Sequence, residues 1–248
     1  MKKVMLVTGA SRGIGAATAR LAAERGYAVC VNFRARDDEA RRLVGEIAHR
    51  GGEAIAVAGY VGREDDVLRL FAEVDSRLGR LTALVNNAGI LEAQMRVEDM
   101  PAARIDRILR TNVLGAFLCC REAVRRMARD RGGAGGAIVN VSSAASRLGA
   151  PGEYVDYAAS KGAIDTLTIG LAQEVGPQGI RVNAVRPAFI YTDIHASGGE
   201  PGRVDRVKAG VPLRRGGTAE EVARAILWLA SDESSYTSGT LVDVAGGR

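Results

Sequence analysis

The 248-residue sequence has few of the residues that build metal sites and disulfide frameworks. Its two histidines, His49 and His195, are too few and too far apart for a metal cluster, so we expect no metal. Its three cysteines, Cys30, Cys119 and Cys120, are an odd number in apolar stretches, which favours buried, reduced thiols. No apolar run reaches the roughly 18 residues of a membrane span, and no signal peptide is evident. These absences predict a soluble, cytoplasmic protein without a membrane partner.

Lysine is scarce as well. The net charge of +5 comes from 34 basic and 29 acidic residues, and only four of the basic residues are lysines: Lys2, Lys3, Lys161 and Lys208. The basic residues are scattered over many predicted helices rather than gathered in a stripe, so we expect a solvated, arginine-rich surface and no nucleic-acid partner. Lys161 is conspicuous because a compact ammonium differs chemically from the guanidinium used almost everywhere else.

Apolar, β-branched segments alternate with segments of helical period along the chain. This pattern predicts strands at residues 4–8, 28–33, 54–58, 81–86, 137–142, 179–185 and 240–244. It predicts helices at 13–25, 37–49, 67–78, about 101–130 and 155–175, and a last helix after 218. We expect Asp37 or Asp38 to cap the second helix, and Thr218 and Glu221 to form a capping box.

Strict alternation of strands and helices predicts an α/β fold with a Rossmann-type, doubly wound parallel sheet and helices on both faces. No linker or repeat divides the chain, so residues 1–248 are expected to form a single domain. One region, about 187–215, is rich in glycine and proline and lacks a regular pattern. We predict that it is a mobile flap outside the core.

A glycine-rich turn links the first predicted strand to the first predicted helix. Gly9, Gly13 and Gly15 lie there, and such glycines let a pyrophosphate approach helix-terminal N–H groups, although glycine also serves tight turns. The second strand ends without an acidic residue that would bind a ribose 2′-hydroxyl. Arg12 and Arg34 are instead expected to converge on a 2′-phosphate, with an ordinary surface role as the alternative. The pattern therefore predicts NADP(H) rather than NAD(H).

Tyr157 and Lys161 are four residues apart in a predicted helix, so both project from one face. A carbonyl that accepts a hydride needs a proton, but a phenol with a pKa of about 10 is a poor partner at neutral pH. An adjacent ammonium lowers the pKa of the phenol, which makes the pair suitable for proton transfer. Ser142 and Ser143 follow the fifth strand, where either can contact a substrate oxygen or simply form a turn.

Five ordered segments resemble the short-chain dehydrogenase/reductase family, and the resemblance extends over nearly the whole chain. They are the loop TGASRGIG (8–15), NNAG (86–89), TNVLG (111–115) around Asn112, YAASK (157–161) and Arg186-Pro187. The resemblance implies an NAD(P)-dependent enzyme that acts on CH–OH groups of a small-molecule carbonyl or alcohol. It also implies a homotetramer, built partly through the helix that carries Tyr157 and the segment 238–243.

The resemblance implies a role for each matching residue. Tyr157 would be the general acid or base, Lys161 would tune it and hold the nicotinamide ribose, and Asn112 would anchor a water in a proton relay. Ser143, in preference to Ser142, would contact the substrate oxygen. The cofactor residues would include Tyr157 and Lys161 together with Gly9, Ser11, Arg12, Gly13, Ile14, Gly15, Arg34, Tyr60, Val61, Asn87, Ala88, Gly89, Pro187, Ile190 and Thr192.

Two departures from the family pattern concern the cofactor pocket. Tyr60 replaces the usual aspartate after the third strand, where it can stack on the adenine or obstruct the pocket. Ala188 replaces the usual glycine after Pro187 and adds a methyl group near the nicotinamide. These departures are the only reason in the sequence to consider a non-catalytic alternative, a nucleotide-binding sensor or scaffold that has lost catalysis.

Within the same chemistry, the chain resembles 3-oxoacyl-[acyl-carrier-protein] reductases and glucose 1-dehydrogenase-like enzymes. A predicted basic patch favours the first, since an acyl carrier is acidic; it comprises Arg125, Arg126, Arg129 and Arg131. No residue argues for the second. The substrate walls are expected from residues 92–100, 147–154 and 189–211, with His195 as a flap or interface residue, but no motif there identifies a substrate.

Overall fold

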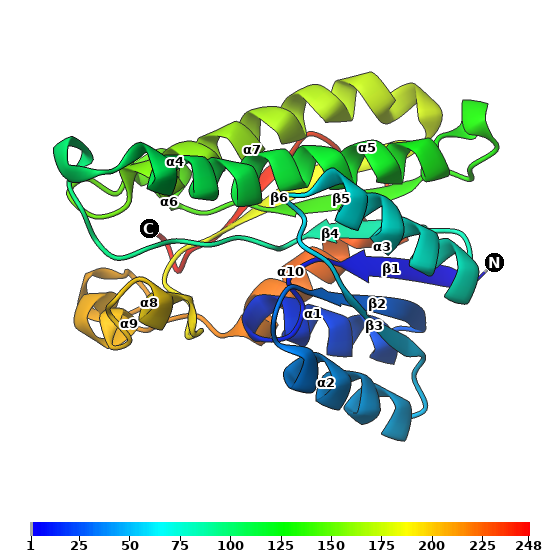
Figure 1. Ribbon diagram of the computed structural model, residues 1–248, viewed down its shortest axis with the longest axis horizontal. Helices are drawn as coiled ribbons and strands as arrows, with labels where there is room; N and C mark the ends of the chain where they lie inside the picture. Colours follow the sequence, from blue (N-terminus) through cyan, green and yellow to red (C-terminus); the bar gives the residue numbers. More distant parts are fainter. Residues whose placement is uncertain (1) are drawn as a thin grey trace.

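The computed structural model describes residues 2–248, which form three layers with a parallel sheet in the middle (Figure 1). The seven strands have the order β3-β2-β1-β4-β5-β6-β7, and every pairing is parallel. They are β1 (Lys3–Val7), β2 (Tyr27–Phe33), β3 (Ala54–Ala58), β4 (Ala83–Asn86), β5 (Gly136–Val141), β6 (Ile180–Pro187) and β7 (Leu241–Val244). The predicted Rossmann-type, doubly wound sheet is confirmed.

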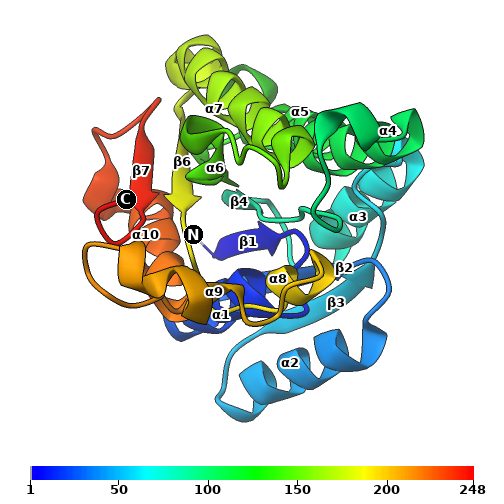
Figure 2. The ribbon, with the colours of Figure 1, turned by 90° about the vertical axis from the view of Figure 1, so that its left-hand side faces the viewer.

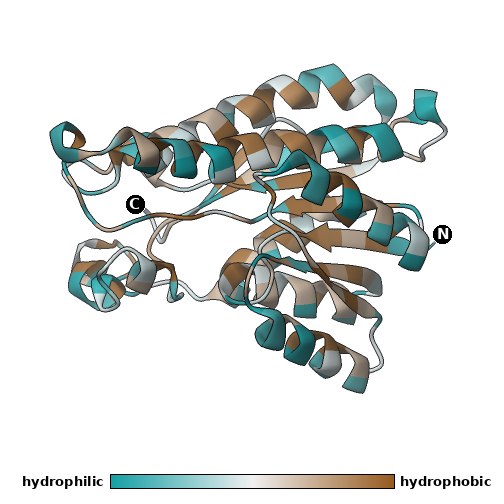
Figure 3. Ribbon diagram, in the orientation of Figure 1, coloured by the Kyte–Doolittle hydropathy of each residue, from teal (hydrophilic) through white to brown (hydrophobic). Residues whose placement is uncertain are grey.

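Helices cover both faces of the sheet. One face carries α3 (Glu64–Arg77), α5 (Gly115–Met127) and α7 (Val155–Val175), and the other carries α1 (Gly13–Glu24), α2 (Asp37–His49) and α10 (Ala219–Ala230). Successive strand residues point to opposite faces, so Leu6 packs on the first side and Met5 on the second. Because both faces are covered, the strands are mostly hydrophobic while the helices keep hydrophilic outer sides (Figure 3).

The helix predicted over 101–130 contains a local irregularity. It is built from α4 (Ala102–Leu109), a π-helical turn (Arg110–Leu114) and α5, and the N–H of Gly115 donates to the carbonyl of Arg110 five residues earlier. Such single π turns leave the hydrophobic pattern almost unchanged, so they cannot be predicted from it.

The two capping predictions had different outcomes. The capping box is confirmed, because the N–H of Glu221 donates to Thr218 Oγ1 at 3.3 Å and Glu221 Oε2 accepts from the N–H of Thr218 at 2.9 Å. The cap expected from Asp37 or Asp38 is wrong, since Arg36 precedes α2 and no side chain caps it. Both aspartates lie instead in the first turn, where negative charge favours the helix dipole.

The segment 187–215 lies at the carboxyl edge of the sheet, which Figure 2 faces. It contains two short helices, α8 (Ile194–Ser197) and α9 (Arg203–Val207). Its placement wholly outside the core is wrong, because Ile190, Val204 and Val211 are buried. Helices of four or five residues are too short to produce a recognisable period.

The fold bears on the cysteines, the membrane prediction and the metal prediction. Cys30, Cys119 and Cys120 are free and buried, as predicted. Within residues 2–248, no helix has both the length and the apolar character needed to cross a bilayer. The same residues contain no cluster of histidine, cysteine and acidic side chains that would hold a metal ion.

Candidate active site

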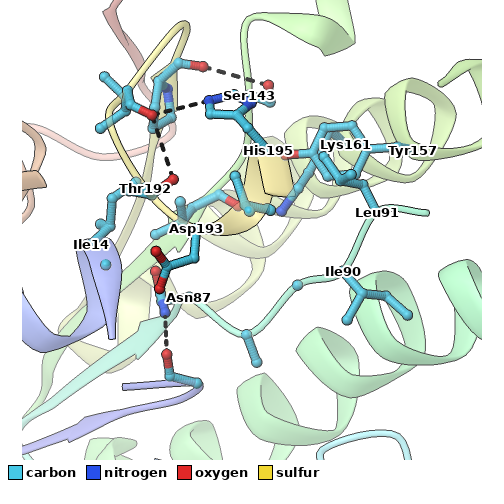
Figure 4. A pocket seen from close by; sticks show the side chains of 18 of the residues that line it. Ile14, Asn87, Ile90, Leu91, Ser143, Tyr157, Lys161, Thr192, Asp193 and His195 are labelled. Atoms are coloured by element: carbon cyan, nitrogen blue, oxygen red, sulfur yellow. Dashed lines mark hydrogen bonds between the residues drawn. The ribbon is translucent and has the colours of Figure 1, made fainter. Parts of the chain in front are cut away.

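A cavity of about 620 Å³ opens at the carboxyl edge of the sheet. Ligands of open α/β sheets bind at this edge, because the loops that follow the strands converge there. The cavity brings together every predicted site residue except Gly15 and Asn112. The expected substrate walls at 147–154 and 189–211 contribute to it, but residues 92–100 do not, and Ile90 and Leu91 lie there instead (Figure 4).

The turn between β1 and α1 has no room for a side chain at Gly9 or Gly15. A Cβ on Gly9, whose φ is +60°, would stand 2.8 Å from Ala88 Cα, and one on Gly15 would stand 2.5 Å from Asn87 Nδ2. Asn87 Nδ2 donates to the carbonyls of Thr8 and Gly9 at 2.9 Å each and so locks the turn against the end of β4. Gly15 therefore does not line the cavity, but it leaves space for the Asn87 side chain that holds the turn in place.

The N-terminus of α1 is left open toward the cavity. Arg12 is its N-cap residue and makes no side-chain cap, and the first turn contains no acidic side chain. The first N–H groups of a helix have no partner within the helix. Together with the helix dipole they form a site suited to a phosphate group.

Three arginines surround the far end of the cavity beyond β2. Arg12 Nη1 lies 3.2 Å from Asp193 Oδ2 in the flap, and Arg36 Nη1 lies 2.7 Å from Glu39 Oε1. Arg34 is exposed and has no carboxylate partner among residues 2–248. Arg12 and Arg34 both line the cavity, and Arg12 also ties the glycine turn to the flap through Asp193.

Tyr157 and Lys161 project from the first turns of α7 beside Ser143 (Figure 4). Lys161 Nζ donates to the carbonyl of Val141 at 2.7 Å and lies 5.6 Å from the centre of the Tyr157 ring. Burial lowers the pKa of Lys161 to about 8, against a smaller opposing effect of Asp165. The ammonium is thus held at the end of β5 and remains mostly protonated at neutral pH.

The pKa of Tyr157 does not follow the simple expectation of a phenol acidified by its lysine. Burial raises it to about 12, and a hydrogen bond with Ser143 has the smaller, opposite effect. Loss of solvation of the phenolate outweighs the effect of this hydrogen bond. Tyr157 is therefore neutral at pH 7 and available as a proton donor.

The two candidate serines have different surroundings. The hydroxyl of Ser142 donates to the carbonyl of Lys161 at 3.2 Å, and the residue is buried. Ser143 Oγ lies 3.4 Å from the carbonyl oxygen of Pro187 and accepts from the N–H of Ala145 at 3.1 Å, at the start of α6 (Ala145–Leu148). Only Ser143 affects the pKa of Tyr157, which favours it as the serine that would share a ligand oxygen with the phenol.

Asn112 lies in the π turn, behind the cavity wall. Its Oδ1 accepts from the N–H of Ile90 at 2.8 Å, and its Nδ2 donates to the Ile90 carbonyl at 2.9 Å and to Ser160 Oγ at 3.0 Å. The amide is thus engaged with both the loop after β4 and helix α7. Its side chain holds these two parts of the site together.

The cavity also contains Tyr154 and Arg203, which belong to the expected walls but were not named individually, and Arg248, which lies outside every predicted site segment. His195, expected to be a flap or interface residue, is a buried cavity residue on α8, and its Nε2 lies 3.0 Å from the Ile190 carbonyl (Figure 4). Burial lowers the pKa of His195, so its imidazole is neutral at pH 7. These residues follow no shared motif, because the flap brings them to the site only in three dimensions.

Comparison with known proteins gives consistent matches over the whole chain. A family model described as enoyl-(acyl carrier protein) reductase matches residues 9–248. The chain is 60% identical over 245 residues to the uncharacterized oxidoreductase YgfF of Escherichia coli K12, covering 99% of both proteins. It is 37% identical over 247 residues to the 3-oxoacyl-[acyl-carrier-protein] reductase FabG of Staphylococcus epidermidis, covering 100% of this chain and 99% of the relative.

Solved structures match equally well. A short-chain dehydrogenase/reductase from Mycobacterium marinum superposes with a TM-score of 0.92 at 35% identity, covering 99% of this chain and 94% of that one. A Serratia marcescens short-chain dehydrogenase/reductase mutant has a TM-score of 0.90 at 31% identity, covering 99% and 97%. The sequence motifs, the fold and the position of the cavity agree with these matches. The chain is an oxidoreductase of the short-chain dehydrogenase/reductase family.

Proposed function

We propose that the protein is an NADP(H)-dependent oxidoreductase that interconverts a carbonyl and a secondary alcohol of a small molecule. The observation that carries this proposal is one continuous cavity with the open α1 N-terminus and Arg34 at one end and Ser143, Tyr157 and Lys161 at the other. Such a cavity can hold a dinucleotide with its phosphates on the helix and its nicotinamide beside the phenol.

The residues present fit such a cofactor. A Cβ on Gly9 or Gly15 would collide with its neighbours, and Gly13 has a φ of +55°, so the turn keeps an uncovered backbone that a pyrophosphate can approach. The end of β2 carries Arg34 and no acidic residue, which suits a 2′-phosphate better than a 2′-hydroxyl. When bound, NADPH would supply the hydride, and the protein would supply the binding geometry and the proton.

The proton chemistry belongs to the chain's own side chains. In reduction, the neutral phenol of Tyr157 donates its proton to the substrate oxygen, which the hydroxyl of Ser143 also contacts. The nearby Lys161 ammonium, anchored to Val141, stabilises the negative charge that develops on the phenol. In oxidation, Tyr157 must first lose its proton and then accepts one from the alcohol.

The decisive experiment is a fluorescence titration with NADPH and NADH, followed by a panel of carbonyl substrates with the preferred nucleotide. Tyr157→Phe should abolish turnover and leave nucleotide binding nearly unchanged, since only the hydroxyl is removed. Tyr236→Phe is the matched control, because Tyr236 is fully exposed. Undiminished turnover in Tyr157→Phe would refute the proposed role of the phenol.

Reduction of 3-oxoacyl groups on an acyl carrier protein is a second candidate, supported by the 37% identity to FabG. The basic patch that favoured it is partly neutralised, since Arg125 and Arg126 both pair with Glu122 and Arg126 also pairs with Asp75. Turnover of a 3-oxoacyl thioester would favour this candidate. Tight NADPH binding without turnover of any carbonyl would favour the sensor or scaffold instead.

We also propose a cytoplasmic homotetramer, as the family resemblance implies. Leu109, Leu114 and Phe117 leave large apolar side chains exposed along α4, the π turn and α5, and Ile169 does so on α7. Apolar surface of this kind is typical of interfaces between copies. Light scattering should show a tetramer, and Phe117→Glu should dissociate it; a monomeric wild type would contradict the proposal.

A further inference from the structure

Tyr60 follows β3, where the family pattern has an aspartate, and both its backbone and its side chain are held by hydrogen bonds. Its hydroxyl lies 2.8 Å from Thr111 Oγ1, in the π turn before α5. Its N–H donates to Asp66 Oδ2 at 3.0 Å, at the start of α3. The ring therefore spans the gap between the end of β3 and the π turn, while still forming part of the cavity wall.

Gly62 makes room for this ring. A Cβ at position 62 would stand 2.6 Å from Tyr60 Cζ and 2.7 Å from its hydroxyl oxygen, closer than any stable contact. The φ of Gly62 is not in the left-handed region, so an alanine there would leave the backbone unstrained. It would displace the tyrosine ring instead.

Arg34 is held by this ring. Its guanidinium carbon lies 4.4 Å from the centre of the Tyr60 ring, within the range of a cation–π contact. The other two arginines at this end direct N–H donors to carboxylates, Arg12 to Asp193 and Arg36 to Glu39. The Arg34 guanidinium makes no hydrogen bond or ion pair with another residue among residues 2–248, so its N–H donors are available for a planar or tetrahedral anion.

We propose that Tyr60 is a positioning residue that holds Arg34 with its donors free for the 2′-phosphate of the cofactor. Tyr60 thereby contributes to the discrimination between NADPH and NADH. An aspartate at this position would place a carboxylate beside Arg34 and compete with the phosphate for its donors. The inference rests on the proposed use of NADP(H), and it assigns Tyr60 neither of the roles considered from the sequence, which were adenine stacking and obstruction.

The test is calorimetric titration of the full chain with NADPH, NADH and 2′,5′-ADP. Tyr60→Ala should weaken NADPH and 2′,5′-ADP about tenfold, because the guanidinium loses its support. The affinity for NADH, which has no 2′-phosphate, should change much less. Tyr60→Phe keeps the ring and should stay close to the wild type, whereas Gly62→Ala should weaken NADPH selectively, as Tyr60→Ala does.

A double-mutant cycle separates positioning from mere stability. If Tyr60 acts through Arg34, then Tyr60→Ala should have no further effect on NADPH affinity once Arg34 is alanine. Equal losses for NADPH and NADH, or no loss for either, would overturn the inference while leaving the proposed function standing. Tighter binding of NADH than NADPH by the wild type would refute the proposed cofactor, and the inference with it.

Discussion

At the level of single residues, the buried Lys161 of the candidate active site lowers the stability of the folded protein. The ammonium is buried, and its pKa falls from 10.5 to about 8. A lowered lysine pKa means that the folded state binds this proton less tightly than the unfolded state does. The resulting loss of folding stability is fully present below pH 8. It disappears as the pH rises to 10.5, the pKa of this lysine in the unfolded chain.

Lys161→Met should therefore stabilise the fold. We expect a gain of roughly 3 kcal/mol at pH 7, since each pKa unit corresponds to about 1.4 kcal/mol. The gain should shrink between pH 8 and 10.5, and turnover should be lost at every pH. Urea unfolding of both proteins at pH 7 and pH 10.5 measures the difference. A methionine variant no more stable than the wild type at pH 7 would contradict the argument.

The same lysine predicts the pH dependence of reduction. kcat/KM with respect to NADPH reports the pKa values of the free enzyme. It should fall as the pH rises through about 8, because Lys161 loses the charge that supports proton release from Tyr157. Steady-state kinetics between pH 6 and 10 would show this limb. A rate that stays level across this range would exclude Lys161 as the titrating group.

At the level of secondary-structure elements, a buried ion pair joins α4 to the start of α7. Arg104 Nε and Nη2 lie 2.8 and 3.3 Å from the carboxylate oxygens of Asp156, and Nη1 donates to the carbonyl of Ala93 at 2.6 Å. Asp156 Oδ1 also accepts from the N–H of Tyr157 at 2.9 Å. The pair therefore connects α4 with the residue that carries the phenol.

Arg104→Met should destabilise the fold by about 3–5 kcal/mol, because it leaves the Asp156 carboxylate buried without a partner. The double variant Arg104→Met, Asp156→Leu should recover much of that loss. Chemical unfolding of the three proteins measures both effects. Arg107→Met is the control on the same helix, since its pair with Glu92 is largely exposed and should matter far less. Similar losses at both arginines would contradict the argument from burial.

Most elements follow from local pattern. The run Ala54–Ala58 and the helix Val155–Val175 match their predicted bounds, because a short apolar strand and a long helix differ clearly in length and composition. The local pattern does not predict the π turn around Asn112 or the short helices α8 and α9. They depend on contacts such as that of Asn112 with Ile90, which a local pattern does not contain.

At the level of the whole molecule, cofactor binding should be visible as added stability. A ligand that binds only the folded state at 100 times its Kd contributes about 2.7 kcal/mol. For a chain of this size, that corresponds to a rise in Tm of roughly 5–10 °C. Thermal unfolding with NADPH should show this rise, and NADH at the same concentration should give a smaller one. Equal shifts would argue against selection at the 2′-position.

The sequence by itself determined the layered α/β architecture, the family, and the set of residues at the carboxyl edge of the sheet. It could do so because hydrophobic period and short motifs are local properties, and parallel strands bring their carboxyl ends to one edge. Only the tertiary structure decided how those residues act on one another. Burial raises the pKa of Tyr157 to about 12, the flap engages Arg12, and the Tyr60 ring supports Arg34. Desolvation and contacts between distant segments depend on which residues pack around each group. The spacing of residues along the chain therefore cannot predict them.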